Sequence, residues 1–141
     1  SKGRLLLPSS FKEQLGDAIE EGFVLRPSLF GGCLELFGMK DWRAMQDKLG
    51  KLNPFKAVNL MLIRRFNAGA RMVKVDANGR LQIPKDLIEK TNLVKEVVMT
   101  SVIDRMQIWD RSLKDIEDSK MSEKELAEML TAKLGDMDFI G

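Results

Sequence analysis

The stretch VDANGRLQIP, residues 75–84, decides how this chain folds. The Asn78-Gly79 pair is the strongest short-range signal for a β-hairpin, because both residues tolerate positive φ. Apolar and polar residues alternate on both sides of the turn, so successive side chains point to opposite faces of the strands. The predicted inner face consists of Val73, Val75, Leu81 and Ile83, and the predicted outer face of Lys74, Asp76, Arg80 and Gln82.

Asp76 and Arg80 straddle this turn, and their spacing predicts a cross-strand ion pair. On its own the motif is consistent with a surface hairpin whose weak salt bridge contributes about 0–1 kcal/mol. A functional interpretation therefore needs further observations.

The first residues of the chain, SKGRLLLP, repeat the centre of the hairpin. Aligning the two copies sets Gly3 on Gly79, Arg4 on Arg80 and Pro8 on Pro84. Each copy then continues with a short helix, an apolar strand, a turn and an alternating closing strand. The predicted helices cover 9–22 and 85–93, the strands 23–25, 33–37, 96–99 and 105–109, and the turns 28–32 and 101–104.

Helical patterns fill the rest of the chain. Residues 39–52 have apolar residues at helical spacing, and 122–135 begin with a Ser-x-x-Glu capping box before an apolar stripe. Residues 57–66 are ambiguous, although a helix would place Arg64 and Arg65 favourably at its C-terminal end. The predicted organisation is a first half at 1–40, a connecting helical segment at 41–66, a second half at 67–112 and a helical tail at 113–141.

The composition argues against several classes of protein. The 141 residues are 44% hydrophobic and 31% charged, which is typical of a globular domain. The chain has no histidine and no evident pair of catalytic carboxylates, so we expect neither an enzyme nor a metal site. No apolar run approaches the roughly 20 residues of a membrane span. The single cysteine, Cys33, and the absence of a signal-peptide pattern predict the cytoplasm.

The net charge of +2 conceals an asymmetry. Residues 1–103 carry 17 Lys or Arg against 11 Asp or Glu, whereas 104–141 carry 6 against 10. Between residues 64 and 80 the positive side chains are Arg64, Arg65, Arg71, Lys74 and Arg80, and the acidic one is Asp76. Arginine on a rigid strand beside a tight turn suits phosphate contact and bidentate reading of guanine.

These motifs resemble a known family. The pattern Asp-x-x-Gly-Arg-x-x-x-Pro at residues 76–84 is similar to the start of the AbrB/SpoVT swapped-hairpin DNA-binding domain. Two copies in one chain, with GGCLELF at 31–37, FNAGARMVKVDANGR at 66–80 and RMQIWD at 105–110, resemble the MraZ family. The resemblance covers roughly residues 1–112. In the first copy Arg4 matches but the Asp would precede Ser1, so a strand of the first hairpin is expected to be missing.

The resemblance implies an α+β, β-rich fold: a pseudo-two-fold swapped-hairpin barrel with short helices and a C-terminal helix. It implies a DNA-binding role for Arg4, Lys2, Arg80 and Lys74, and a structural role for Gly3, Pro8, Asp76, Asn78, Gly79 and Pro84.

The implied function is that of a sequence-specific, cofactor-free transcriptional regulator such as a repressor. It would bind short direct repeats in double-stranded DNA upstream of the division and cell-wall gene cluster, and so regulate that cluster and its own gene. It would act as a nucleoid-associated homo-oligomer with the form of a ring, and with neither a membrane partner nor a small-molecule substrate. The alternative is a barrel used only for assembly, which has no need of the basic residues beside its turn.

Overall fold

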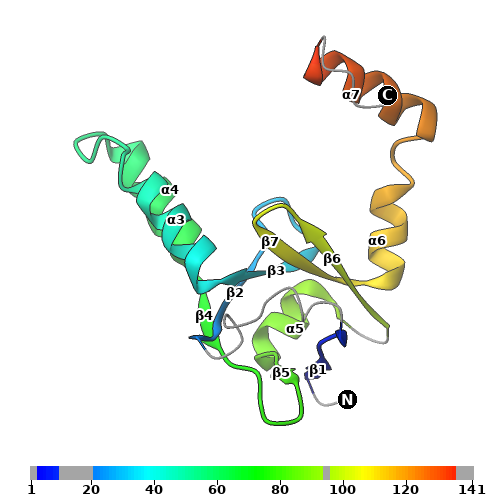
Figure 1. Ribbon diagram of the computed structural model, residues 1–141. Coiled ribbons are helices and arrows are strands. Elements are labelled where there is room, and N and C mark those ends of the chain that lie inside the picture. Colours follow the sequence, from blue (N-terminus) through cyan, green and yellow to red (C-terminus); the bar gives the residue numbers. More distant parts are fainter. Residues whose placement is uncertain (1–2, 10–20, 94–95, 136–141) are drawn as a thin grey trace.

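A computed structural model describes residues 3–9, 21–93 and 96–135 of the chain (Figure 1). Along the sequence the elements are β1 (Arg4–Leu6), β2 (Phe23–Pro27), β3 (Cys33–Gly38), α3 (Met39–Leu49), α4 (Ala57–Asn67), β4 (Arg71–Val73), β5 (Arg80–Gln82), α5 (Lys85–Thr91), β6 (Val97–Val102), β7 (Arg105–Asp110), α6 (Arg111–Asp118) and α7 (Glu123–Leu134). The predicted α+β class is confirmed. The strands form a five-stranded sheet, in the order β4-β2-β3-β7-β6, and a two-stranded sheet of β1 and β5. The described part of the chain therefore contains no closed barrel.

The two halves of the sequence are interleaved in both sheets by a pseudo-two-fold relation. In the centre of the larger sheet β3 pairs with β7, and Glu35 lies opposite Gln107. An offset of 72 residues carries Glu35 onto Gln107, so the local axis passes between them. In the smaller sheet Leu5 lies opposite Leu81, and an offset of 76 residues likewise exchanges them. The sequence repeat thus builds a shared structure and not two separate domains.

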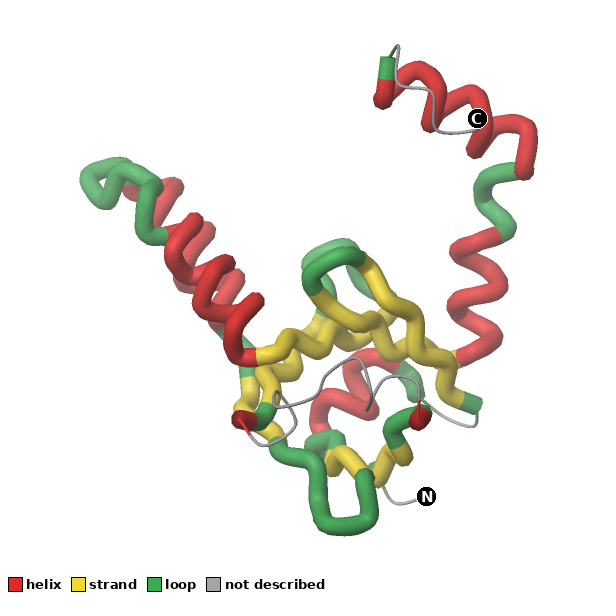
Figure 2. The backbone as a smooth tube through the Cα atoms, in the orientation of Figure 1, coloured by secondary structure: helices red, strands yellow, loops and turns green. Residues whose placement is uncertain are grey.

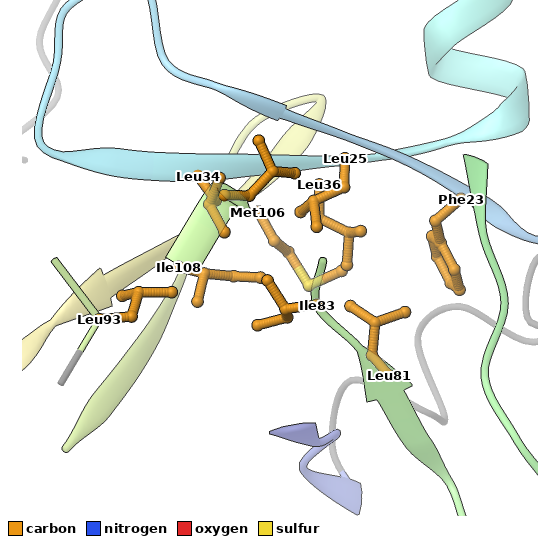
Figure 3. Packing of buried hydrophobic residues seen from close by; sticks show 10 residues of the cluster. Phe23, Leu25, Leu34, Leu36, Leu81, Ile83, Leu93, Met106 and Ile108 are labelled. Atoms are coloured by element: carbon orange, nitrogen blue, oxygen red, sulfur yellow. The ribbon is translucent and has the colours of Figure 1, made fainter. Parts of the chain in front are cut away.

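The main core lies between one face of the five-stranded sheet and the layer formed by β5 and α5 (Figure 1), and Figure 3 shows most of its side chains from close by. Alternation along the strands supplies its side chains, because every second residue points to this face. The cluster consists of Phe23, Leu25, Leu34, Leu36, Leu81, Ile83, Leu87, Leu93, Met106 and Ile108, with Val73 and Val75 packed against it. The predicted inner face of the hairpin is therefore confirmed.

A second cluster lies on the opposite face of the five-stranded sheet, under the base of the α3–α4 hairpin. Val24, Phe37 and Phe66 are buried there, and Trp42 packs against them. The Trp42 ring stacks on Phe66 at a centroid distance of 5.7 Å and meets Phe37 edge-on at 5.3 Å. The ambiguous segment at 57–66 is thus helical, and its last aromatic residue anchors the hairpin to the sheet.

A buried ionic cluster occupies the same face. Arg26 and Glu35 are only 2% and 3% exposed. The Arg26 Nε donates to the Phe66 carbonyl at 2.9 Å, and its guanidinium lies 4.4 Å from the centre of the Phe66 ring. Glu35 accepts hydrogen bonds from Arg105 at 3.2 Å and from Gln107 at 3.3 Å. Sequence reasoning did not find this cluster, although Arg26 and Glu35 each interrupt an apolar strand.

Two helical arms leave the sheet on opposite sides, one formed by α3 and α4 and the other by α6 and α7 (Figure 2). The predicted helix at 122–135 is α7, whose capping box joins Ser122 and Glu125. Helix α6 lies in the predicted helical tail except for its first two residues, although no separate helix was predicted there. It begins after the N-cap Asp110, whose Oδ1 accepts the N–H of Ser112 at 3.1 Å. The predicted helix at 9–22 falls almost wholly at 10–20, outside the described residues.

Candidate nucleic-acid interface

The turn between β4 and β5 is held by the Asp76 side chain. Its Oδ1 accepts the backbone N–H groups of Asn78 at 2.8 Å and of Arg80 at 2.9 Å. The N–H of Gly79 also donates to the Asp76 carbonyl at 3.0 Å, and Gly79 has a φ of 76°. This arrangement is a type I turn followed by a left-handed glycine, a common three-residue hairpin loop. Positive φ occurs at Gly79 but not at Asn78, so only half of the predicted Asn-Gly geometry is present.

The predicted ion pair between Asp76 and Arg80 is wrong, because the carboxylate binds backbone N–H groups instead of the guanidinium. The pKa of Asp76 is lowered, first by the hydrogen bond from the Arg80 N–H and to a smaller extent by the charges of Arg80 and Arg4. The acid therefore shapes the loop, and the Arg80 guanidinium stays exposed.

Strands β1 and β5 present Arg4 and Arg80 on one surface. Arg4 pairs with Gln82 and Leu6 pairs with Arg80, so all four side chains lie on the solvent face, while Leu5 and Leu81 point inward. The two arginines are diagonal neighbours, whose Cα atoms are expected roughly 7–8 Å apart. Among the described residues, no side chain forms a hydrogen bond or ion pair with either guanidinium.

The glycines before these arginines are also equivalent. Gly3 has a φ of 80°, and its carbonyl accepts the N–H of Ile83 at 2.6 Å. The Gly79 carbonyl accepts the N–H of Leu7 at 3.1 Å. The pseudo-two-fold relation therefore orders both Gly-Arg copies in the same way, and Arg4 and Arg80 occupy equivalent places.

The structure extends this surface to Lys74. Val75 bridges to Leu81, so the next positions outward place Lys74 beside Gln82, in the same row as Arg4. Lys74 is exposed, and Lys2 lies outside the described residues. We define the basic face as Arg4, Lys74 and Arg80.

The remaining predicted basic residues do not join the basic face. Arg71 forms a bidentate salt bridge with Asp86, in which Nη2 lies 2.6 Å from Oδ2 and Nη1 lies 3.4 Å from Oδ1. Arg64 and Arg65 lie in the last turn of α4, beyond the opposite face of the five-stranded sheet. The positive run in the sequence is thus divided among three parts of the fold.

The two prolines of the repeat lie just after the Gly-Arg strands. Pro84 precedes α5, and its carbonyl accepts the N–H groups of Leu87 at 3.0 Å and Ile88 at 3.2 Å. Pro8 is exposed after β1. Pro84 therefore links β5, which carries Arg80, directly to the core helix α5.

The chemistry of this surface favours binding of an anion. Arginine can donate paired hydrogen bonds to phosphate or guanine, and lysine adds a mobile positive charge. Within 3–9, 21–93 and 96–135, no cluster of three His, Cys, Asp or Glu side chains could hold a metal ion. None of the helices described is long and apolar enough to cross a membrane.

Comparison with known proteins adds a family. Residues 66–133 match the family model described as "MraZ protein, putative antitoxin-like". The chain is 44% identical over 141 residues to the transcriptional regulator MraZ of Flavobacterium psychrophilum, covering 99% of this chain and 90% of that protein. Its identity to the transcriptional regulator MraZ of Christiangramia forsetii is 42% over 143 residues, covering 100% and 90%. The protein of the same name from Clostridium tetani is 33% identical over 132 residues, covering 93% and 89%.

Proposed function

The chain belongs to the MraZ family, and from that premise we propose that it is a DNA-binding transcriptional regulator and not an enzyme. The observation that carries the proposal is the basic face, on which the repeat presents Arg4 and Arg80 in equivalent places. A module used only for assembly has no need of two exposed arginines in matched settings.

In this proposal Arg4 and Arg80 read bases or clamp phosphates, while Lys74 and Lys2 add contacts to the DNA backbone. In this proposal Asp76, Asn78, Gly79 and Gly3 keep the turn and the strands in the shape that orients the arginines, and Pro8 and Pro84 do so at the ends of the two copies. Because both Gly-Arg copies are fixed by backbone hydrogen bonds, the backbone loses little conformational entropy when the arginines bind.

The proposed targets are short direct repeats upstream of the division and cell-wall gene cluster, through which the protein regulates that cluster and its own gene. The three cations of the basic face give one chain few contacts with DNA. Non-specific binding of proteins to DNA has dissociation constants of about 10⁻⁴–10⁻⁶ M. A ring of identical chains would raise the affinity for repeated boxes by roughly 10²–10⁴ through effective concentration. Such a regulator works in the cytoplasm, on the nucleoid.

The proposed division of labour follows the sequence organisation. Residues 1–40 and 67–112 together form the DNA-binding body, while 41–66 and 113–141 form the two arms. Strand pairing between the halves supports this proposal, because β1 of the first half requires β5 of the second.

The test is binding of a fluorescent DNA fragment from upstream of the gene, measured over a salt series. Wild-type affinity is expected to fall steeply with salt, and a variant with both Arg4→Ala and Arg80→Ala is expected to lose affinity and part of the salt slope. The matched control is Arg43→Ala, an exposed arginine on α3. Equal binding by all three proteins would remove the basic face from the proposal.

A second arm of the test varies the number of boxes. An operator cut to one box, or with its boxes moved half a helical turn apart, is expected to bind far more weakly. An oligomer that forms normally and binds none of these DNAs would instead favour the assembly module.

A further inference from the structure

One side of α4 is apolar and exposed. The residues of α4 that turn toward the sheet and α3 include the buried Phe66. Val58, Met61 and Leu62 follow the spacing i, i+3, i+4 along a flank of α4 next to that face, and they are 52%, 41% and 51% exposed. Arg65 continues the same row at i+7. We call these four residues the α4 stripe.

A second apolar stripe runs along α7. Leu126, Met129, Leu130 and Leu134 share one side of this helix, and each is 37–46% exposed. Every residue from Glu123 to Leu134 is exposed, so nothing in the described chain covers the helix. Its ends are nevertheless well formed, with a complete capping box at Ser122. We call the four apolar residues the α7 stripe.

The charges around the two stripes are complementary. The α3–α4 hairpin, residues 39–67, carries seven Lys or Arg against two Asp or Glu. Its positive end is the last turn of α4, with Arg64 and Arg65, while the first turn of α7 contains Glu123 and Glu125. Antiparallel packing would bring these two ends together and would also oppose the two helix dipoles favourably.

The two stripes of one chain cannot meet as the arms stand, because α3–α4 and α6–α7 project on opposite sides of the sheet (Figure 1). We propose that the α7 stripe of one chain packs antiparallel on the α4 stripe of a second copy. The contact rests on the self-association proposed above and gives it a surface. Helix α4 has 11 residues and α7 has 12, so their stripes are matched in length.

The test is cross-linking between two differently labelled chains in the absence of DNA. One chain carries Met61→Cys and the other Leu130→Cys, and a short bis-maleimide joins thiols that lie close together. The native Cys33 is buried, and burial, with the nearby Glu35 charge, raises its pKa to about 11, so it does not compete. The expected product is a covalent dimer containing one chain of each kind.

The matched control replaces Leu130→Cys by Ala132→Cys, which lies on the opposite side of α7. This pair is expected to give no dimer above background. In a further arm, Arg65→Glu in the first chain is expected to lower the cross-linking yield. Glu123→Arg in the second chain is expected to restore it, which a merely structural effect on either helix would not do.

Each outcome decides the proposal. Equal yields from Leu130→Cys and Ala132→Cys would overturn the contact. A chain carrying both Met61→Cys and Leu130→Cys that closes only on itself would also overturn it. Light scattering on the wild-type protein separates the two proposals: an oligomer without the cross-link removes the contact alone, whereas a monomer removes self-association as well.

Discussion

Two pairs of arginines in this molecule differ sharply in their surroundings. On the five-stranded sheet Arg26 and Arg105 lie around Glu35, and carbonyl, carboxylate and aromatic groups surround them. On the two-stranded sheet Arg4 and Arg80 are exposed, and no carboxylate within 3–9, 21–93 and 96–135 binds their guanidinium groups. The inner arginines are tied into the fold, whereas the outer arginines are available to a ligand.

The two pairs also differ in symmetry. Arg4 and Arg80 are exchanged by the repeat, but the repeat places Cys33 at the position of Arg105 and Gln107 at that of Glu35. A second carboxylate opposite Glu35 would bring two like charges together in a buried place, which is costly. The core therefore departs from the repeat where charge balance requires it, and the outer surface keeps it.

The largest expected effect on stability comes from disrupting the buried ionic cluster around Glu35. Glu35→Ala leaves the Arg26 guanidinium buried without its carboxylate, and such changes typically cost about 3–5 kcal/mol of unfolding free energy. The Arg26 Nη1 already lacks a hydrogen-bond partner, so the site has no spare acceptor for it. Urea unfolding measures the loss.

The control for this prediction is Arg4→Ala, which is expected to change the unfolding free energy by no more than about 0.5 kcal/mol, as for other exposed sites. If both variants unfolded at the same urea concentration, the distinction between structural and available arginines would fail.

The next effect concerns the outer pair. Arg4→Ala and Arg80→Ala are each expected to weaken operator binding by on the order of 1–3 kcal/mol. Because the repeat gives the two arginines equivalent places, their losses should be similar. Fluorescence anisotropy at one fixed salt concentration compares them. A loss confined to one variant would show that DNA reads only half of the symmetric surface.

The hairpin, helix α7 and the matching positions of the outer arginines could all be predicted from the sequence. Alternation around Asn78-Gly79 predicted the inner and outer faces of the hairpin, because a strand has a period of two whatever its partner. The capping box and apolar spacing predicted α7, because both signals are local. The repeat itself placed Arg4 and Arg80 in corresponding positions.

What the sequence did not reveal depends on contacts between distant residues. The Arg26–Glu35 group needs a pairing of β2 with β3 and the arrival of Phe66 from α4. Likewise, Arg71 looked like part of the basic surface until the fold brought Asp86 beside it. Charge counted along the chain cannot show which charges are neutralised in space.

A smaller effect tests whether Gly3 is needed to aim Arg4. A Cβ at Gly3 would lie 2.9 Å from the Ile83 carbonyl oxygen and 2.9 Å from the Gln82 Nε2, at a φ of +80°. Gly3→Ala is therefore expected to cost roughly 1–2 kcal/mol for the left-handed backbone, with a further cost for the close contacts. Thermal unfolding measures it.

Gly31→Ala provides the matched control, because Gly31 has a φ of +81° but no atom within 4 Å of an added Cβ. It should be less destabilising than Gly3→Ala and should leave DNA binding intact. Equal melting temperatures for the two variants would mean that the close approach of Gly3 to β5 is not important.

The smallest effect concerns Asp76, the acid beside the outer arginines. Hydrogen bonds from backbone N–H groups lower its pKa below the unfolded value of about 3.9. A depressed carboxyl pKa stabilises the fold above the unfolded pKa, and this contribution is lost as pH falls through the folded pKa.

Asp76→Asn keeps an oxygen that can accept the same two hydrogen bonds, but its side chain cannot titrate. Its unfolding free energy should therefore fall less than that of the wild type between pH 5 and pH 2, as measured by urea unfolding at each pH. The other carboxyl groups titrate in both proteins, so the difference between the two curves isolates Asp76. Curves that run parallel through this range would show that the charge of Asp76 does not hold the turn, and the aim of Arg80 would then depend on Gly79 alone.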